Sequence, residues 1–237
     1  MRRRLLLGWC LTAATWWAFP LPFPPHLGAG WPPVAAGAAS LEEVVERVQT
    51  VCAQTQDLSA RFQQTATNRT LNSVQEASGV FLAKRPGKMR WEYQKPDARL
   101  FVTDGKTLWA YSPSEKQVVV QDIAEAMTSR LPLAFLAGNC ALAKDFDIGS
   151  VEHAGTRGTP GTRILDLTPK RPEAGIARML LEVSVKNFTV EKTTLFDAYG
   201  NTTTIALSQL KLNGGLDDQQ FRFAPPPGVN VVAPGKP

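Results

Sequence analysis

The residues that could carry out chemistry are few and lie far apart in the chain. His153 is the one histidine beyond the first forty residues, and a lone histidine in a strand-to-loop stretch is typical of a surface residue. Asp145 and Asp147 flank a phenylalanine, and Asp217-Asp218 lie in a turn-like stretch, so solvated carboxylates explain both pairs better than acid–base catalysis. No serine nucleophile elbow, cysteine–histidine pair or paired-histidine metal spacing occurs. We therefore expect no catalytic residue, no metal site and no cofactor, and predict that the chain is not an enzyme.

Two cysteines, Cys52 and Cys140, lie beyond the first forty residues. An even pair in an exported protein favours a disulfide, because disulfides form in oxidising compartments. Two buried free thiols are the alternative, since free cysteine behaves as a small apolar residue. Both interpretations stay open at the level of sequence.

The start of the chain has the layout of a secretory signal. Arg2–Arg4 precede an apolar run, Leu5–Ala18, and a stretch rich in Pro, Ala and Gly follows. Small residues in Ala36-Gly37-Ala38 suit a signal peptidase, so we predict cleavage near Ala38, with Gly37 or Ala39 as alternatives. The prolines between positions 20 and 25 argue against an uncleaved anchor, because they would break a spanning helix. The expected organisation is a leader, 1–38, and a single exported domain, 39–237.

Removal of this leader changes the charge balance of the protein. Three of the 26 basic residues leave with it, so 23 remain against 21 acidic residues, a net charge of +2. No basic stripe survives, and we therefore expect no nucleic-acid partner. The remaining chain is long enough for one well-packed domain.

One helix and many strands are expected to position the remaining residues. Ser40 can cap a helix that begins at Leu41 and ends near residues 53–56, with apolar residues recurring every three or four positions. From Leu58 the apolar period changes to two, which indicates a strand. Further strands are expected at Ala77–Lys84, Lys88–Tyr93, Arg99–Thr103, Thr107–Tyr111, Gln117–Gln121, Asp145–His153, Thr162–Pro169, Met179–Lys186, Val190–Asp197 and Thr202–Lys211.

Two segments interrupt or end this series. Ile123–Leu136 is apolar and predicts one or two short helices broken at Pro132. Phe221 and Phe223 indicate a short terminal strand before a proline-rich tail. The fold class that we predict is α+β: an incomplete, half-open antiparallel β-barrel of about 10–11 strands, with helices covering its hydrophobic hollow.

Six motifs occur in an order that resembles one family. They are Phe62-Gln63-Gln64, the run from Gly79 to Trp91 with Lys84-Arg85-Pro86, Thr103-Asp104-Gly105-Lys106-Thr107-Leu108-Trp109, Pro132-Leu133-Ala134-Phe135-Leu136, Leu165–Lys170, and the terminal Phe221-Arg222-Phe223 with Pro227-Gly228-Val229 and Val231. Together they span roughly residues 41 to 232. In these stretches the sequence resembles the periplasmic outer-membrane lipoprotein carriers called LolA.

This resemblance implies a monomeric carrier of acylated lipoproteins. Its partners would be an inner-membrane lipoprotein-releasing ABC transporter and an outer-membrane lipoprotein acceptor. In the family, the arginine of the Lys-Arg-Pro motif holds a lid helix through hydrogen bonds, and that residue is Arg85 here. The apolar residue four positions later contacts membrane partners. It is Met89 here, where better-known relatives carry Phe.

Strand alternation gives an expected lipid-binding face. Phe81, Ala83 and Arg85 share one strand face, Met89, Trp91 and Tyr93 share another, and we predict that both faces point inward. An inward arginine must be hydrogen-bonded, because an unpaired buried charge is costly. A packed core is an equally good explanation for Trp91. The residues expected to contact acyl chains are Phe62, Phe81, Ala83, Met89, Trp91, Tyr93, Trp109, Leu131, Leu133, Phe135 and Leu136.

Two other functions stay open. A periplasmic lipid- or glycolipid-binding protein, or a sensor of envelope stress, would use the same fold, although such sensors usually carry a second domain. A periplasmic hydrolase belongs to a different class and would need a nucleophile constellation that the sequence does not show.

Overall fold

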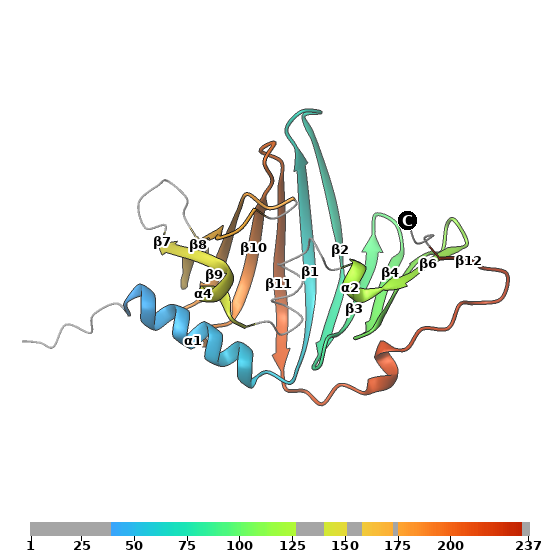
Figure 1. Ribbon diagram of the computed structural model, residues 1–237, viewed down its shortest axis with the longest axis horizontal. Helices are drawn as coiled ribbons and strands as arrows, with labels where there is room; N and C mark the ends of the chain where they lie inside the picture. Colours follow the sequence, from blue (N-terminus) through green and yellow to red (C-terminus); the bar gives the residue numbers. More distant parts are fainter. Residues whose placement is uncertain (1–38, 127–139, 151–157, 173–174, 234–237) are drawn as a thin grey trace, which may run out of the picture. The chain divides into compact units, whose positions relative to one another are not determined.

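A single twelve-stranded sheet dominates the computed structural model, which describes residues 39–126, 140–150, 158–172 and 175–233 (Figure 1). These residues all belong to one unit, Ala39–Pro237. The elements are α1 (Leu41–Gln54), β1 (Asp57–Asn68), β2 (Ser73–Lys84), β3 (Lys88–Lys95), β4 (Arg99–Asp104), β5 (Thr107–Ser112), β6 (Gln117–Asp122), α2 (Ile123–Ala126), α4 (Leu142–Asp145), β7 (Phe146–Ser150), β8 (Thr162–Pro169), β9 (Arg178–Ser184), β10 (Val190–Phe196), β11 (Thr202–Leu212), η1 (Asp218–Phe221) and β12 (Asn230–Val232).

The strands are ordered β12-β6-β5-β4-β3-β2-β1-β11-β10-β9-β8-β7, and neighbours are antiparallel except for the parallel pair β12 and β6. In the described part of the chain β12 and β7 are the two ends of this order, so the sheet is not closed. The predicted fold class is therefore confirmed: a mostly-strand, open barrel-like sheet with few helices.

The C-terminal strand differs from the expectation. Phe221 belongs to the 3₁₀ turn η1, because the side chain of Asp217 accepts the backbone N–H of Gln219 and starts a helical turn. The terminal strand comes later, at Asn230–Val232, and pairs with β6. The sheet has twelve strands, against the ten or eleven that we expected.

Helix α1 packs on one face of the sheet. Ser40 caps it as predicted, accepting the N–H of Glu43 at 3.2 Å. Its apolar stripe, which includes Val44 and Val48, is buried in a cluster with β8, β9 and β10. The strand residues of this cluster include Leu165, Leu167, Met179, Leu181, Val183 and Val190. Burial of this stripe is the main source of stability for a helix of this length.

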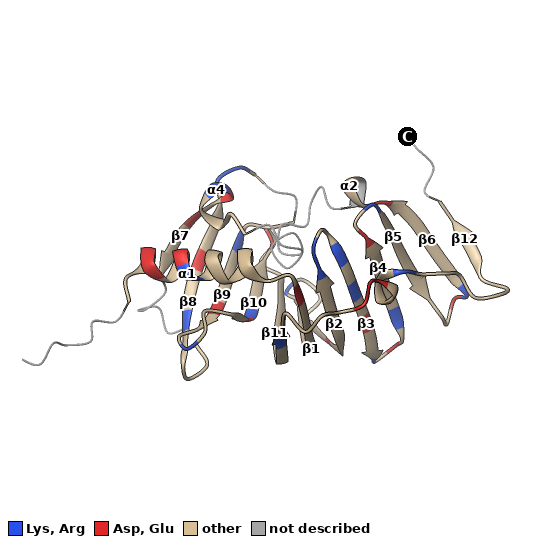
Figure 2. Ribbon diagram, turned by 90° about the horizontal axis from the view of Figure 1, so that it is seen from below, with Lys and Arg blue, Asp and Glu red and all other residues tan. Residues whose placement is uncertain are grey.

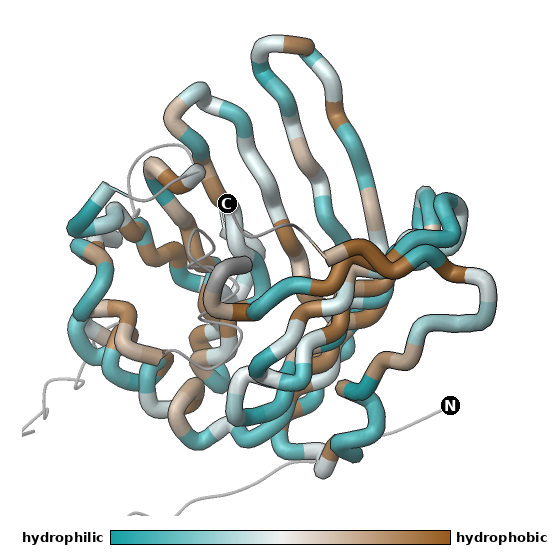
Figure 3. Tube along the Cα trace, turned by 45° about the vertical axis from the view of Figure 1, so that its right-hand side comes forward, coloured by the Kyte–Doolittle hydropathy of each residue, from teal (hydrophilic) through white to brown (hydrophobic). Residues whose placement is uncertain are grey.

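A second cluster lies on the same face of the sheet. It contains Phe62, Phe81, Ala83, Met89 and Trp91. Strand register shows that both clusters share a face, because paired residues, and residues two apart in a strand, lie on the same side of a sheet. Phe62 pairs with Leu207 of β11. Two residues along β11, Ile205 pairs with Thr193. Thr193 in turn pairs with Leu181 of the first cluster. We call this shared side the inner face. Figure 3 shows hydrophobic and hydrophilic positions alternating along the strands.

The opposite side, the outer face, is crossed by the segment that follows β11. η1 contacts β3 and β4, as Figure 2 shows, and Phe221 is 1% exposed. Asp218 forms salt bridges of 2.7 Å with both Lys84 and Lys88. These contacts fix the segment across the strands that carry the second cluster on their inner side.

Candidate functional site

Aromatic rings form the centre of the inner face. The ring of Trp91 lies 4.8 Å from that of Phe62 and 4.3 Å from that of Phe81, measured between centroids. Tyr93 is 4.9 Å from Phe62 in an edge-to-face arrangement. Gly79 permits this packing, because a Cβ at that position would lie 1.9 Å from the carbonyl oxygen of Glu92. Such ring contacts add to the burial of apolar area.

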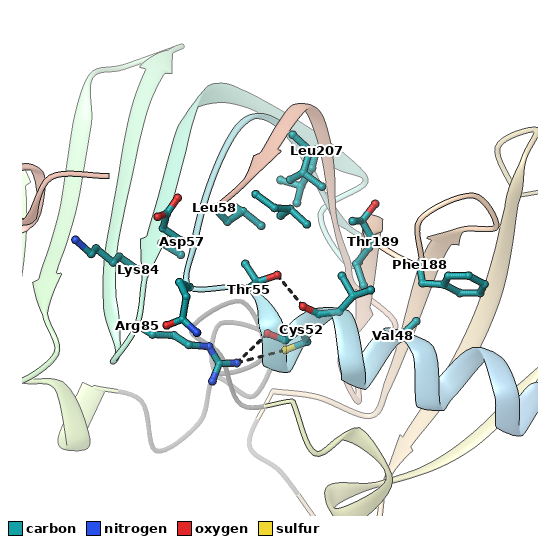
Figure 4. A pocket seen from close by; sticks show the side chains of 16 residues that line it. Val48, Cys52, Thr55, Asp57, Leu58, Lys84, Arg85, Phe188, Thr189 and Leu207 are labelled. Atoms are coloured by element: carbon teal, nitrogen blue, oxygen red, sulfur yellow. Dashed lines mark hydrogen bonds between the residues drawn. The ribbon is translucent and has the colours of Figure 1, made fainter. Parts of the chain in front are cut away.

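A hollow that is open to solvent adjoins this aromatic cluster. It lies between the C-terminal half of α1 and strands β1, β2, β10 and β11, and it is shown in Figure 4. Its lining is largely apolar, with Val48 and Val51 from α1 facing Leu58 and Leu207 from the sheet. The remaining lining residues are Cys52, Thr55, Gln56, Asp57, Ala83, Lys84, Arg85, Phe188, Thr189, Val190, Leu210 and Leu212.

Arg85 lies at one end of this hollow, where β2 meets the end of α1 (Figure 4). Its guanidinium donates a hydrogen bond of 3.0 Å to the carbonyl of Cys52 and lies 2.8 Å from the sulfur of Cys140. Its backbone N–H donates to the carbonyl of Gln56 at 2.8 Å. A cation beside the last carbonyls of a helix is favourable because the helix dipole is negative there. These bonds compensate for the partial burial of the charge.

The two cysteines form a disulfide in the structure. Cys52 lies in α1 and Cys140 precedes α4, and their Cα atoms are 5.6 Å apart. The bond therefore ties α1 to the segment that follows the predicted lid. The lid motif itself, Pro132–Leu136, lies outside the described residues, so the lid-holding role of Arg85 stays a prediction.

The structure brings together six of the residues expected to contact acyl chains. Phe62, Phe81, Ala83, Met89 and Trp91 are buried in the second cluster, and Tyr93 packs against it. Leu131, Leu133, Phe135 and Leu136 lie outside the described residues.

Trp109 lies on the other side of the sheet, which corrects its expected position. Trp91 pairs with Phe101 and Phe101 with Ala110, so Ala110 occupies the inner face of β5. Trp109 instead pairs with Val102 and shares the outer face. The register of the hairpin between β4 and β5 causes this, because a shift of one residue moves a side chain to the opposite face.

Sequence reasoning missed Asp57, which is 6% exposed. One of its carboxylate oxygens accepts the N–H of Gly214 at 2.7 Å, and the other accepts those of Gly215 and Leu216 at 2.9 and 3.3 Å. The carboxylate thus fixes the loop that leads from the inner-face hollow to the outer-face segment. The acceptors and donors are more than 150 residues apart in sequence, so no local signal could have revealed them.

The carboxylate of Asp218 on the outer-face segment is held in its ionised form. Hydrogen bonds from Lys84 and then Lys88 lower the pKa of Asp218 to about 2. At neutral pH this carboxylate is therefore fully ionised and holds both lysines. No helix in the described ranges is long and apolar enough to span a membrane.

Comparison with known proteins agrees with this architecture. A 37% identical protein named outer-membrane lipoprotein carrier protein, from Chromobacterium violaceum, matches 84% of this chain and 93% of its own length. One of the same name from Dechloromonas aromatica is 34% identical over 84% of this chain and 90% of its own length. An uncharacterized conserved protein from Thermus thermophilus shares the fold, with a TM-score of 0.54 at 17% identity, covering 83% of this chain and 100% of that one. The family described as outer membrane lipoprotein carrier protein LolA matches residues 53–224, and the chain belongs to this family.

Proposed function

We propose that this protein is a periplasmic, non-enzymatic carrier that binds the acyl chains of lipoproteins on the inner face of its sheet. In this proposal it receives lipoproteins released by an inner-membrane ABC transporter and delivers them to an acceptor at the outer membrane. The observation that supports it best is the continuous apolar inner face, with aromatic rings and a hollow, on a sheet that is not closed.

The physical requirement for such cargo is a dry surface. Each CH₂ group of an acyl chain gains about 0.8 kcal/mol on leaving water, so a chain needs a long apolar contact surface. The inner face carries apolar side chains from Leu58 and Leu207 to Phe81 and Trp91, and the buried ones become a contact surface when that face opens. A sheet with two free ends also lets cargo enter and leave without crossing a closed wall.

Two site residues have proposed roles in transfer. Arg85 would hold the closed state through the end of α1 and the segment at Cys140. Met89 would contact a membrane partner. It is 5% exposed in this structure, so that contact requires the inner face to open first.

The proposed location rests on the export signal and on the disulfide. The layout of residues 1–38 is that of a signal peptide, with cleavage proposed near Ala38. A structural disulfide is stable in an oxidising compartment such as the periplasm.

A matched pair of leucine variants tests the binding site. Leu58 lines the hollow, whereas Leu71, in the turn between β1 and β2, is 73% exposed. We expect Leu58→Asp to reduce retention of a triacylated lipopeptide at least about tenfold, because a charge in the hollow opposes burial of hydrocarbon there. Leu71→Asp should retain the lipopeptide as the wild type does. Equal retention by both variants would show that acyl chains bind elsewhere.

Release and delivery need a separate assay. Inner-membrane vesicles that contain the transporter are incubated with ATP and the protein, and soluble lipoprotein is measured before and after outer-membrane vesicles are added. Failure of the protein to release any lipoprotein would contradict the proposed transport step, even if the lipopeptide binds.

A further inference from the structure

Trp91 carries an unusual polar atom in the centre of the inner face. Its side chain is 6% exposed, and within the described residues its indole Nε1 is the one buried side-chain donor or acceptor without a hydrogen-bond partner. Buried polar groups in proteins are nearly always hydrogen-bonded, and an exception requires an explanation. This N–H is therefore a donor with spare capacity in an apolar site.

Among the described residues, none accepts a hydrogen bond from this N–H. The nearest rings belong to Phe62 and Phe81, and aromatic faces are weak acceptors. The hydroxyl of Tyr93 donates to the side-chain oxygen of Gln64 at 2.9 Å. A water molecule would need two or more polar partners, and an aromatic cluster does not supply them. An acceptor that arrives with an apolar ligand fits these surroundings better, and at 6% exposure Trp91 meets it once the inner face opens.

We propose that the Trp91 indole N–H donates a hydrogen bond to an ester carbonyl that joins an acyl chain to the glyceryl group of its lipoprotein. This inference rests on the proposed function and identifies a polar contact within it. An acyl chain is hydrocarbon except at that carbonyl, and the carbonyl is a strong acceptor. One donor at a fixed place on the face then sets how deep a chain lies, while the surrounding rings contact the hydrocarbon.

The test compares two ligands that differ only in their ester carbonyls. One is a lipopeptide whose glyceryl-cysteine carries two palmitoyl esters, and the other is the same lipopeptide with two hexadecyl ethers. We expect the wild type to bind the ester about fivefold to tenfold more tightly, the effect of one net neutral hydrogen bond. Trp91→Phe keeps a ring but removes the N–H, so it should bind both ligands alike.

Trp109→Phe is the matched control, because Trp109 lies on the outer face. It should keep the wild-type preference for the ester. A second measurement follows the indole ¹⁵N–¹H resonances of the wild type during titration with each lipopeptide. The two variants serve only to assign these resonances. The Trp91 resonance should move downfield with the ester and not with the ether, while that of Trp109 stays in place.

Three results would overturn the inference. The wild type could bind ester and ether equally, Trp91→Phe could keep the preference, or the Trp91 resonance could respond to both ligands alike. In each case acyl binding itself would still stand. If neither lipopeptide bound the wild type, the proposed function would fail together with this inference, so the two failures can be told apart.

Discussion

Removal of the Cys52–Cys140 disulfide should lower the free energy of unfolding by about 4.6 kcal/mol at 25 °C. The bond closes a loop with a sequence separation of 88 residues, and the entropy of closing such a loop in the unfolded chain gives this magnitude. The tie joins α1, which covers β8–β10, to the segment before α4. Without it the unfolded chain gains freedom, while the contacts of α1 remain available.

The assay is urea unfolding, monitored by circular dichroism, of the oxidised wild type and of the double variant Cys52→Ser/Cys140→Ser. With a slope of about 2 kcal/mol/M, the midpoint should fall by about 2 M. Cys52→Ser alone is the control and should match the double variant, because one thiol cannot form the bond. A fall below about 0.5 M would refute the loop-closure reasoning and would mean that the unfolded chain gains little freedom.

Four other substitutions, three of them paired with a control variant, should give distinct results. Asp57→Ala leaves three backbone N–H groups without their acceptor and should lower the free energy of unfolding in urea by about 1–3 kcal/mol. Asp97 is exposed, and Asp97→Ala should change the free energy of unfolding by less than about 0.5 kcal/mol. Gly79→Ala places a Cβ against the Glu92 carbonyl and should cost about 3 kcal/mol. Gly149→Ala, whose Cβ would meet Asp166 at 4.0 Å, should be close to neutral, and equal midpoints would contradict the packing argument. Because the pKa of Asp218 is lowered from 3.8 to about 2, its stabilising effect is present above pH 3.8 and is lost as the pH falls to 2. The difference in free energy of unfolding between wild type and Asp218→Asn should therefore vanish over that interval. A difference that stays constant would refute this role of Asp218. Arg85→Leu should loosen the closed state and slow transfer of cargo to acceptor membranes. Arg90 lies on the outer face, and Arg90→Leu should transfer cargo as the wild type does. Unchanged transfer by Arg85→Leu would exclude this role for Arg85.

Local patterns predicted most of the fold. The cap at Ser40, the helical stripe of α1 and the alternation along β1 to β11 depend on neighbours within a few residues, so the sequence displays them directly. The inner positions of Phe81 and Trp91 follow from the same alternation. Residues in the lid motif lie outside the described ranges, and their predicted contacts stay predictions.

Long-range register was harder to predict. Trp109 and Trp91 are both aromatic residues in strands, and only the pairing through β4 places them on opposite faces. The bonds of Asp57 to the loop after β11 and the burial of Phe221 depend on a segment that returns across the sheet. The spacing of Phe221 and Phe223 predicts a strand, whereas the hydrogen bond from the Gln219 N–H to the Asp217 side chain places Phe221 in a 3₁₀ turn.

The short strand β12 also determines which strand edge the sheet presents at this end. Residues Asn230–Val232 pair with Gln117–Val119 and occupy the hydrogen-bonding edge of β6. An uncovered strand edge is a template for any extended polypeptide, and strands added there lead to aggregation. A carrier that meets other polypeptides repeatedly is especially exposed to this hazard. The new edge is that of β12 itself, which is only three residues long, and a very short edge strand limits such pairing.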